Sequence, residues 1–257
     1  MRVLRRLVVA VVVGSTCFGC AQRMLDPSEL TGADAAMARR EALADGDGPL
    51  AESLFKEDQA VLSNEDLQRI LSARVALPDR AKLAVVRFGR LPYWWGWSED
   101  FVRVNEQIDA NFLGTLRTSP KLRDVAYLPS LVTPHLMTLP YLRQSAARCQ
   151  ADLLLVYRTS TRTYTKQRWF AADRTRAYCT VEAVVLDTRT GLIPFSTVVN
   201  EYYSAAKTKG DMAFAETVAR AEQKAIGEAW RRVAQETVAY LARGPSAAGE
   251  REARAGS

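Results

Sequence analysis

The chain has 257 residues, 48% of them hydrophobic and 25% charged, which is enough apolar material for a real core in one generous domain or two small ones. These proportions exclude fibrous and disordered proteins. Removing Arg2, Arg5 and Arg6, at the start of the chain, from the formal net charge of +6 leaves +3. Because the rest of the sequence has no compact stripe of Lys and Arg with interleaved aromatic residues, nucleic-acid binding is not expected.

The amino terminus has the pattern of a secretory signal, a basic start followed by an apolar run too short to span a membrane. Phe18-Gly19-Cys20 resembles the end of a bacterial lipobox, although Cys17 stands where such boxes usually have Leu. We expect residues 1–19 to be the signal peptide and Cys20 to carry the lipid that anchors the chain to a membrane. The residue after Cys20 is Ala21 and not Asp, which resembles the pattern of lipoproteins sent to the outer membrane. The chain is therefore expected to be anchored there and to face the periplasm.

Composition divides the remaining chain into three regions. Residues 20–50 lack a sustained apolar face and are expected to form a flexible tether. Residues 51–243 should form a single α/β domain, and residues 244–257 a disordered tail. The first elements expected in the domain are a helix over residues 63–74, with Leu67, Ile70 and Leu71 on one face, and a strand over residues 82–88.

An aromatic loop follows the first strand and contains Tyr93, Trp94, Trp95 and Trp97. The loop could fold back and bury its own rings over the sheet edge. Alternatively, its rings could form a partly exposed patch for a protein partner, a glycan or a membrane interface. Because open α/β sheets place ligand crevices at the carboxyl ends of their strands, we treat these residues as a candidate partner-binding surface.

The middle of the chain alternates helices and strands. A helix should run from the cap at residues 98–100 to Arg117, a second strand should cover residues 124–128, and a further helix should begin at Thr138. The continuous apolar run over residues 151–159 is typical of a strand buried on both faces, and we expect it at the centre of the sheet. This order predicts right-handed crossovers and a mainly parallel core. His135, the single histidine, is expected to be an exposed loop residue.

The pattern changes to antiparallel strands after Thr159. We expect a hairpin whose tip has a basic and aromatic surface, and we treat Trp169 and Phe170 there as further candidate partner-binding residues. Return strands should follow over residues 177–187 and 193–203. A final helix should run over residues 210–243, with Gly227 weakening its middle. The predicted fold is therefore α/β, with a mixed sheet of parallel core and antiparallel extension, helices on both faces and a long C-terminal helix.

The sequence offers one possible disulfide and lacks the common catalytic, metal-binding and phosphate-binding motifs. An oxidising periplasm permits a disulfide between Cys149, at a helix end, and Cys179, in a strand expected beside the central one. Buried free cysteine is the alternative. The sequence has no glycine-rich phosphate loop, no G-x-S-x-G elbow, no HExxH and no CxxC, so we expect no metal, no cofactor and no enzymatic activity.

Three features together carry a resemblance to a family: Cys20, the strand Ala151-Asp152-Leu153-Leu154-Leu155-Val156 after a helix, and the turn Val184-Val185-Leu186-Asp187-Thr188-Arg189-Thr190-Gly191. The chain resembles the superfamily of curli-secretion-channel lipoproteins, the amino-terminal domain of TolB and lipoprotein activators of penicillin-binding proteins. The resemblance covers about Lys82 to Leu241. It implies the fold and a role as a non-catalytic adaptor or assembly factor for an envelope complex.

Two other functions remain open, a ring-forming secretion channel and a lipoprotein that binds a small ligand or glycan. A channel needs membrane-spanning hairpins with roughly ten alternating residues per strand. Residues 159–180 supply at most one, interrupted by Lys166, Arg168, Asp173 and Arg174. An adaptor with an envelope protein partner is therefore the preferred function, and the sequence does not fix its oligomeric state.

Overall fold

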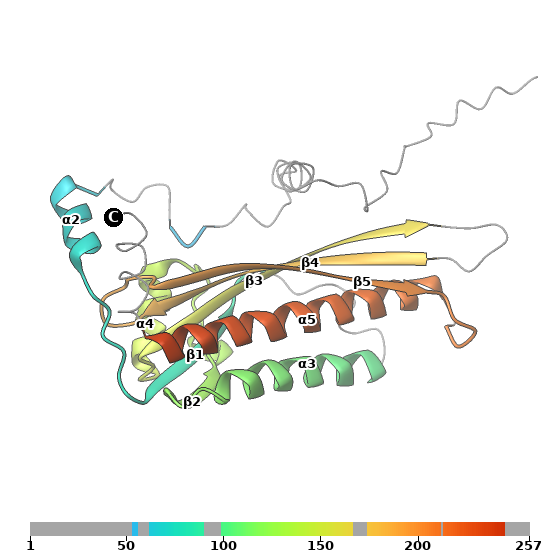
Figure 1. The fold of residues 1–257 in the computed structure, drawn as a ribbon, viewed down its shortest axis with the longest axis horizontal. Coiled ribbons are helices and arrows are strands. Elements are labelled where there is room, and N and C mark those ends of the chain that lie inside the picture. Colours follow the sequence, from blue (N-terminus) through green and yellow to red (C-terminus); the bar gives the residue numbers. More distant parts are fainter. Residues whose placement is uncertain (1–52, 56–61, 90–98, 167–173, 212, 245–257) are drawn as a thin grey trace, which may run out of the picture. The chain divides into compact units, whose positions relative to one another are not determined.

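A computed structural model describes residues 53–55, 62–89, 99–166, 174–211 and 213–244, all of which belong to one compact unit within Pro49–Ser257. The described helices and strands follow one another along the chain as shown in Figure 1. They are α2 (Asn64–Ser72), β1 (Ala81–Arg87), α3 (Glu99–Arg117), β2 (Leu122–Tyr127), a short 3-10 turn η3 (Ser130–Val132), α4 (Leu139–Arg148), β3 (Leu153–Lys166), β4 (Arg174–Asp187), β5 (Phe195–Ala206) and α5 (Phe214–Arg243).

The five strands form one mixed sheet in the order β2-β1-β3-β4-β5. β1 pairs in parallel with β2 and β3, whereas β4 pairs antiparallel with β3 and β5. The central strand is the one predicted, since the side chains from Leu153 to Tyr157 are all buried. The sequence divided this strand at Thr159, but β3 continues without a break to Lys166 and joins the parallel core to the antiparallel extension.

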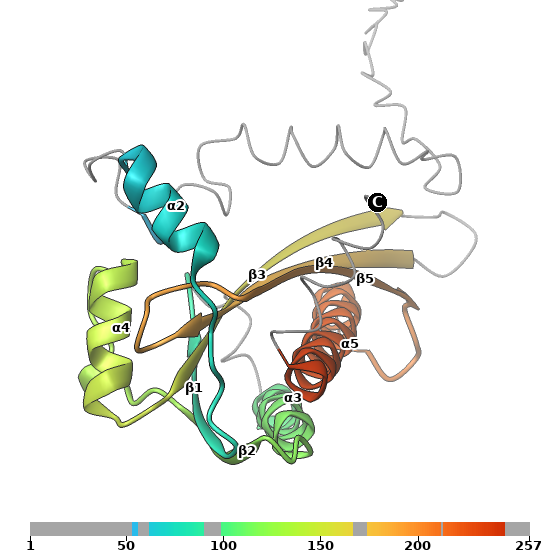
Figure 2. The same ribbon diagram turned by 60° about the vertical axis from the view of Figure 1, so that its left-hand side comes forward.

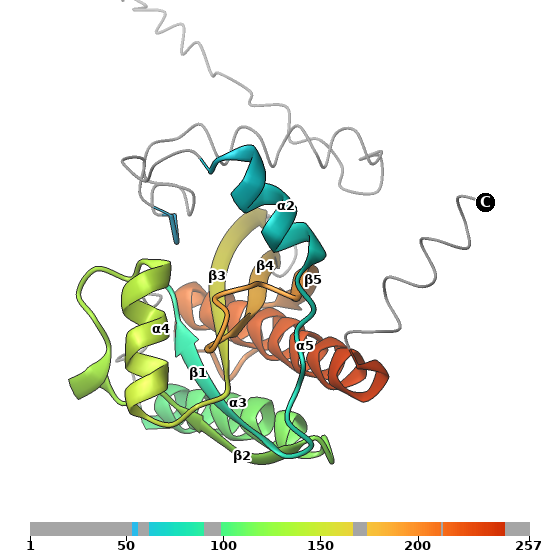
Figure 3. The ribbon, with the colours of Figure 1, turned by 90° about the vertical axis from the view of Figure 1, so that its left-hand side faces the viewer.

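Helices cover both faces of the sheet, which confirms the predicted fold class. Figure 2 shows α3 and α5 on one side of the sheet and α4 on the other, and Figure 3 shows the same arrangement from the end. The larger core, under α3 and α5, includes Phe112, Tyr157 and Trp230. The smaller core, under α4, includes Leu142 and Leu154. None of the helices that the structure describes is both long and apolar enough to cross a membrane.

Within the described residues, two acidic residues of the motifs that carried the family resemblance, Asp152 and Asp187, have structural roles. The Asp152 carboxylate accepts a hydrogen bond from the Lys82 backbone N–H at 2.9 Å and so fixes the start of β3 beside β1. Asp187 accepts the backbone N–H of Thr190 at 3.0 Å and closes the turn between β4 and β5. Gly191 ends that turn with a φ of 79°, the positive value predicted for it, which a side chain would disfavour.

Two helices differ in detail from the sequence prediction. α2 forms with Ser63 as its cap, but Leu67, Ile70 and Leu71 are exposed, so its apolar face has no described partner. α5 begins at Phe214, and its Gly227 lies against Ile108 of α3, since a Cβ there would be 3.4 Å from the Ile108 Cγ1 atom. Gly227 therefore permits close packing of α3 against α5.

Candidate functional site

Most of the residues predicted to be functional lie outside the described ranges. These are Cys20, Tyr93, Trp94, Trp95, Trp97, Trp169 and Phe170. Their predicted roles in lipidation and partner binding stay predictions. His135 is exposed, as expected for a loop residue. Within the part of the chain that is described, no three His, Cys, Asp or Glu side chains converge as metal ligands would.

Of the two alternatives that the sequence left open, a disulfide or free cysteines, the structure has Cys149 and Cys179 as free thiols. Cys149 ends α4 and packs into the core on that face, whereas Cys179 is buried in the core under α5, on the other face. Cys179 pairs with Thr161, eight residues along β3 from Leu153, which places it roughly 26 Å from the start of that strand. The sequence correctly predicted the strand of Cys179 beside the central strand, but it could not give the register of the two strands.

A polar network lies at the carboxyl ends of the parallel strands, where α/β folds commonly bind ligands. Arg87 ends β1, and its guanidinium donates to the Tyr157 hydroxyl at 3.1 Å and pairs with the Asp109 carboxylate of α3 at 3.3 Å. The Tyr127 hydroxyl donates to the same carboxylate at 2.6 Å. The Arg87 guanidinium also lies 4.9 Å from the centre of the Trp230 ring.

This network is internally satisfied. Burial is the main reason that the pKa of Tyr127 is raised far above its ordinary value, and the neighbouring Tyr157 and Asp109 raise it further. Burial also raises the pKa of Tyr157. Both phenols therefore remain protonated and act as hydrogen-bonding groups rather than as acids or bases. The geometry is that of a clamp between α3 and the sheet.

The antiparallel extension has one covered face and one uncovered face. α5 is the described helix that packs against β4 and β5, and Figure 1 shows it along one side of the three strands. Thr175, Ala177, Cys179 and Val181 of β4 are buried on that side. We call the opposite side the ribbon face. It consists of Arg158, Ser160, Arg162, Tyr164, Lys166, Arg174, Arg176, Tyr178, Thr180, Glu182, Val198, Asn200, Tyr202, Ser204 and Ala206.

Three tyrosines stand side by side across the ribbon face. The ring centres of Tyr164 and Tyr178 are 5.7 Å apart, and those of Tyr178 and Tyr202 are 5.9 Å apart. Arg176 contacts two of the three rings, because its guanidinium lies 5.5 Å from the centre of the Tyr202 ring and donates to the Tyr178 hydroxyl at 3.4 Å. The same guanidinium donates to the Ser204 hydroxyl at 3.0 Å. Tyr164 is 49% exposed and Tyr202 is 62% exposed. The ladder is thus an ordered aromatic surface that remains accessible.

The ribbon face is also basic. Arg158, Arg162, Lys166, Arg174 and Arg176 contribute five positive charges and Glu182 one negative charge. Arg158 pairs with Glu182 at 2.6 Å near the parallel core, so that the charges beyond this pair are all positive.

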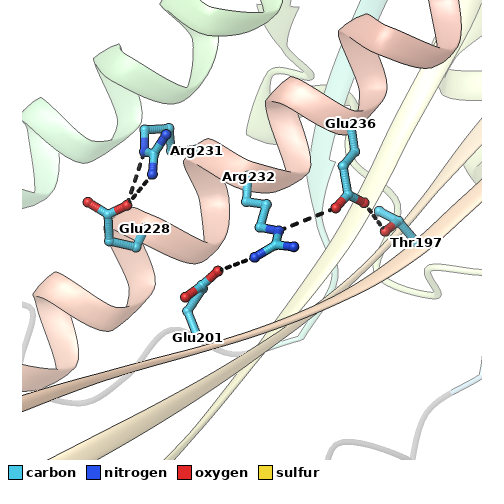
Figure 4. Close-up of polar contacts among 6 residues, drawn as sticks. All are labelled: Thr197, Glu201, Glu228, Arg231, Arg232 and Glu236. Atoms are coloured by element: carbon cyan, nitrogen blue, oxygen red, sulfur yellow. Dashed lines mark hydrogen bonds and ion pairs between the residues drawn. The ribbon is translucent and has the colours of Figure 1, made fainter.

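The covered side of β5 is organised quite differently. Arg232 of α5 pairs with Glu201 of β5 at 3.0 Å and with Glu236 at 3.5 Å, and the Thr197 hydroxyl donates to Glu236 (Figure 4). Arg231 pairs with Glu228 along the helix. The Arg232–Glu201 ion pair and the Thr197–Glu236 hydrogen bond join α5 to β5.

The tyrosine ladder was not predicted from the sequence. A signal for it was present, since basic and aromatic residues alternate with period two before and after the hairpin tip, at Arg162, Tyr164 and Lys166 and at Arg174, Arg176 and Tyr178. This alternation places them on one face of each strand. Their meeting across strands, and the addition of Tyr202, depended on the register of two hairpins.

No family model matches the chain, and no curated protein matches it in sequence. Solved structures with a similar arrangement include a minor lipoprotein from Acinetobacter baumannii, at 9% identity and a TM-score of 0.35 over 62% of this chain and 93% of the other. A lipoprotein from Neisseria meningitidis is 10% identical, with a TM-score of 0.26 over 55% of this chain and 94% of that one. A PelC dodecamer from Paraburkholderia phytofirmans is 13% identical, with a TM-score of 0.27 over 63% and 96%. At these scores the likeness assigns no function.

Proposed function

We propose that this chain is a non-catalytic envelope protein, held by a lipid on Cys20 at the outer membrane and facing the periplasm, which recruits a protein partner through its ribbon face. The observation that carries the proposal is the tyrosine ladder formed by Tyr164, Tyr178 and Tyr202 on a sheet face that no described helix covers.

The composition of the ribbon face is that of a protein-binding surface. Tyr and Arg are enriched among the residues that contribute most to protein interfaces. A tyrosine ring adds a large contact area with few rotatable bonds, so ordering it on binding costs little conformational entropy. Here Arg176 already orders the ladder in the free chain, through its contacts with Tyr202 and Ser204. A partner would therefore meet a preformed surface.

Anchoring is proposed from the amino-terminal pattern that ends at Cys20. Cells grown with a fatty-acid analogue should label the wild-type chain and leave Cys20→Ser unlabelled. Fractionation of the same cells should place the wild type with the outer membrane. Equal labelling of the two chains would refute the lipid anchor, while leaving the ribbon face untouched.

Partner recruitment is tested by two neighbouring tyrosines of β5. Tyr202 lies on the ribbon face, whereas Tyr203, which is 41% exposed, points to the side of the sheet that carries α5. Tyr202→Ser should remove envelope proteins that co-purify with the chain, and Tyr203→Ser should retain them. Both variants should keep nearly the wild-type unfolding midpoint, because both rings are substantially exposed. Retention of the same proteins by Tyr202→Ser would refute the proposed function.

A further inference from the structure

We infer that the partner meets the ribbon face with an acidic, extended polypeptide segment. The inference rests on the proposed function and specifies the chemistry of the partner. Its basis is the excess of basic over acidic side chains among the described residues at the end of the ribbon face farthest from the parallel core, together with the regular spacing of these residues.

The distal residues form three rows across the strands. The rows are Arg162-Tyr178-Tyr202, Tyr164-Arg176-Ser204 and Lys166-Arg174-Ala206. Each row contains at least one cation, and among the described residues none contains a carboxylate. The side chains of Arg162, Lys166 and Arg174 are exposed, so they are open to a partner at the cost of little desolvation.

The spacing of the rows matches that of an extended chain. Arg174 and Arg176 are two residues apart on one face of β4, a separation of about 6.7 Å. Alternate side chains of an extended peptide have the same separation, so carboxylates at every second position of a peptide lying along β4 meet successive rows. Arg162 and Arg174, whose side chains are exposed, can each bind a carboxylate through two parallel hydrogen bonds. The tyrosine rings between the cations supply apolar contact with the intervening residues.

The inference is tested by direct binding with the full chain purified in a non-ionic detergent. The probe is a fluorescent decapeptide of alternating Glu and Thr, and the same peptide with Gln in place of Glu is its control. The wild type should bind the Glu peptide, bind the Gln peptide at least about tenfold more weakly, and lose affinity as salt is raised.

Two charge variants separate a local surface from the net charge. The first, Arg162→Gln with Lys166→Gln and Arg174→Gln, should weaken binding about tenfold or more. The second, Arg103→Gln with Lys121→Gln and Lys224→Gln, removes the same charge from exposed positions outside the ribbon face and should leave affinity unchanged. Equal losses in the two variants would overturn the inference.

Other anionic ligands give outcomes of their own. The other probes are polygalacturonate and vesicles of phosphatidylglycerol in phosphatidylcholine. If the chain binds either of them through Arg162, Lys166 and Arg174 but does not bind the Glu peptide, the partner is not an acidic polypeptide and the inference is wrong. Failure to bind the peptide while Tyr202→Ser still abolishes co-purification overturns this inference alone. Retained co-purification in Tyr202→Ser overturns the proposed function as well.

Discussion

Replacing Gly227 tests the close packing of α3 against α5. A Cβ at this position would lie 3.4 Å from Ile108 Cγ1 and 3.6 Å from Ile108 Cδ1, at the near limit of ordinary contact. Ala in place of Gly in a helix interior gains about 1 kcal/mol. Gly227→Ala should therefore stabilise the chain by about 0.5–1 kcal/mol, a rise of about 1–4 °C in Tm. In Gly227→Leu the longer side chain would collide with Ile108. The resulting overpacking costs about 1–3 kcal/mol of stability, which should outweigh the gain in helix propensity.

Gly114 in α3 provides the matched control, because a Cβ added there meets nothing within 4 Å. Gly114→Ala and Gly114→Leu should both stabilise the chain, since only helix propensity changes. Thermal and urea unfolding of the full chain, followed by circular dichroism, measures all four variants. Ile108→Ala combined with Gly227→Leu should recover part of the loss, because the two changes share one contact. If Gly227→Leu stabilises as much as Gly114→Leu, the described approach of the two helices is wrong.

Three further results are expected. The Thr208 backbone N–H, with Arg220 and Thr217, donates to the Asp211 carboxylate and holds its pKa well below the usual range. The stability that the ionised Asp211 adds is therefore fully present above the ordinary Asp pKa of about 4 and is lost as pH falls through the depressed pKa. In urea unfolding, the loss of unfolding free energy in Asp211→Asn should therefore be largest near neutral pH and smaller in acid. Asp109→Asn weakens the clamp between α3 and the sheet and should lower the free energy of unfolding in urea by about 1–2 kcal/mol. An unchanged urea midpoint would show that the network does not stabilise the fold. Burial raises the pKa of the Cys179 thiol to about 12, so the folded chain should resist alkylation there at pH 8, whereas the urea-unfolded chain should be alkylated at this residue without any reductant.

Sequence reasoning succeeded where local pattern and burial agree. The apolar run at Leu153–Tyr157 predicted a strand buried on both faces, and Gly191 predicted a positive φ at the end of a turn. Both features depend on residues close together in the chain. The continuation of β3 beyond Thr159 was not foreseen, because its residues change from apolar to polar where the strand leaves the parallel core.

The candidate site was harder to predict because it forms between strands. Tyr178 and Tyr202 are far from Tyr164 in sequence, and only the register of β3 with β4 and of β4 with β5 brings their rings together. The same register separates Cys149 from Cys179, which the sequence placed on neighbouring elements. Period-two alternation gives the face on which a residue lies, but the cross-strand partner requires the structure.

The most direct test of the ribbon face is photo-crosslinking in intact cells from two adjacent positions of β5. A benzophenone amino acid is placed at position 202 in one chain and at position 203 in another, so that the probes point to opposite sides of the same strand. We expect a discrete protein adduct from position 202 and none from position 203. The adduct from position 202 should be lost when Arg162, Lys166 and Arg174 are replaced by Gln. An adduct from position 203 alone, or none from position 202 in cells where the chain is anchored, would contradict the proposed role of the ribbon face.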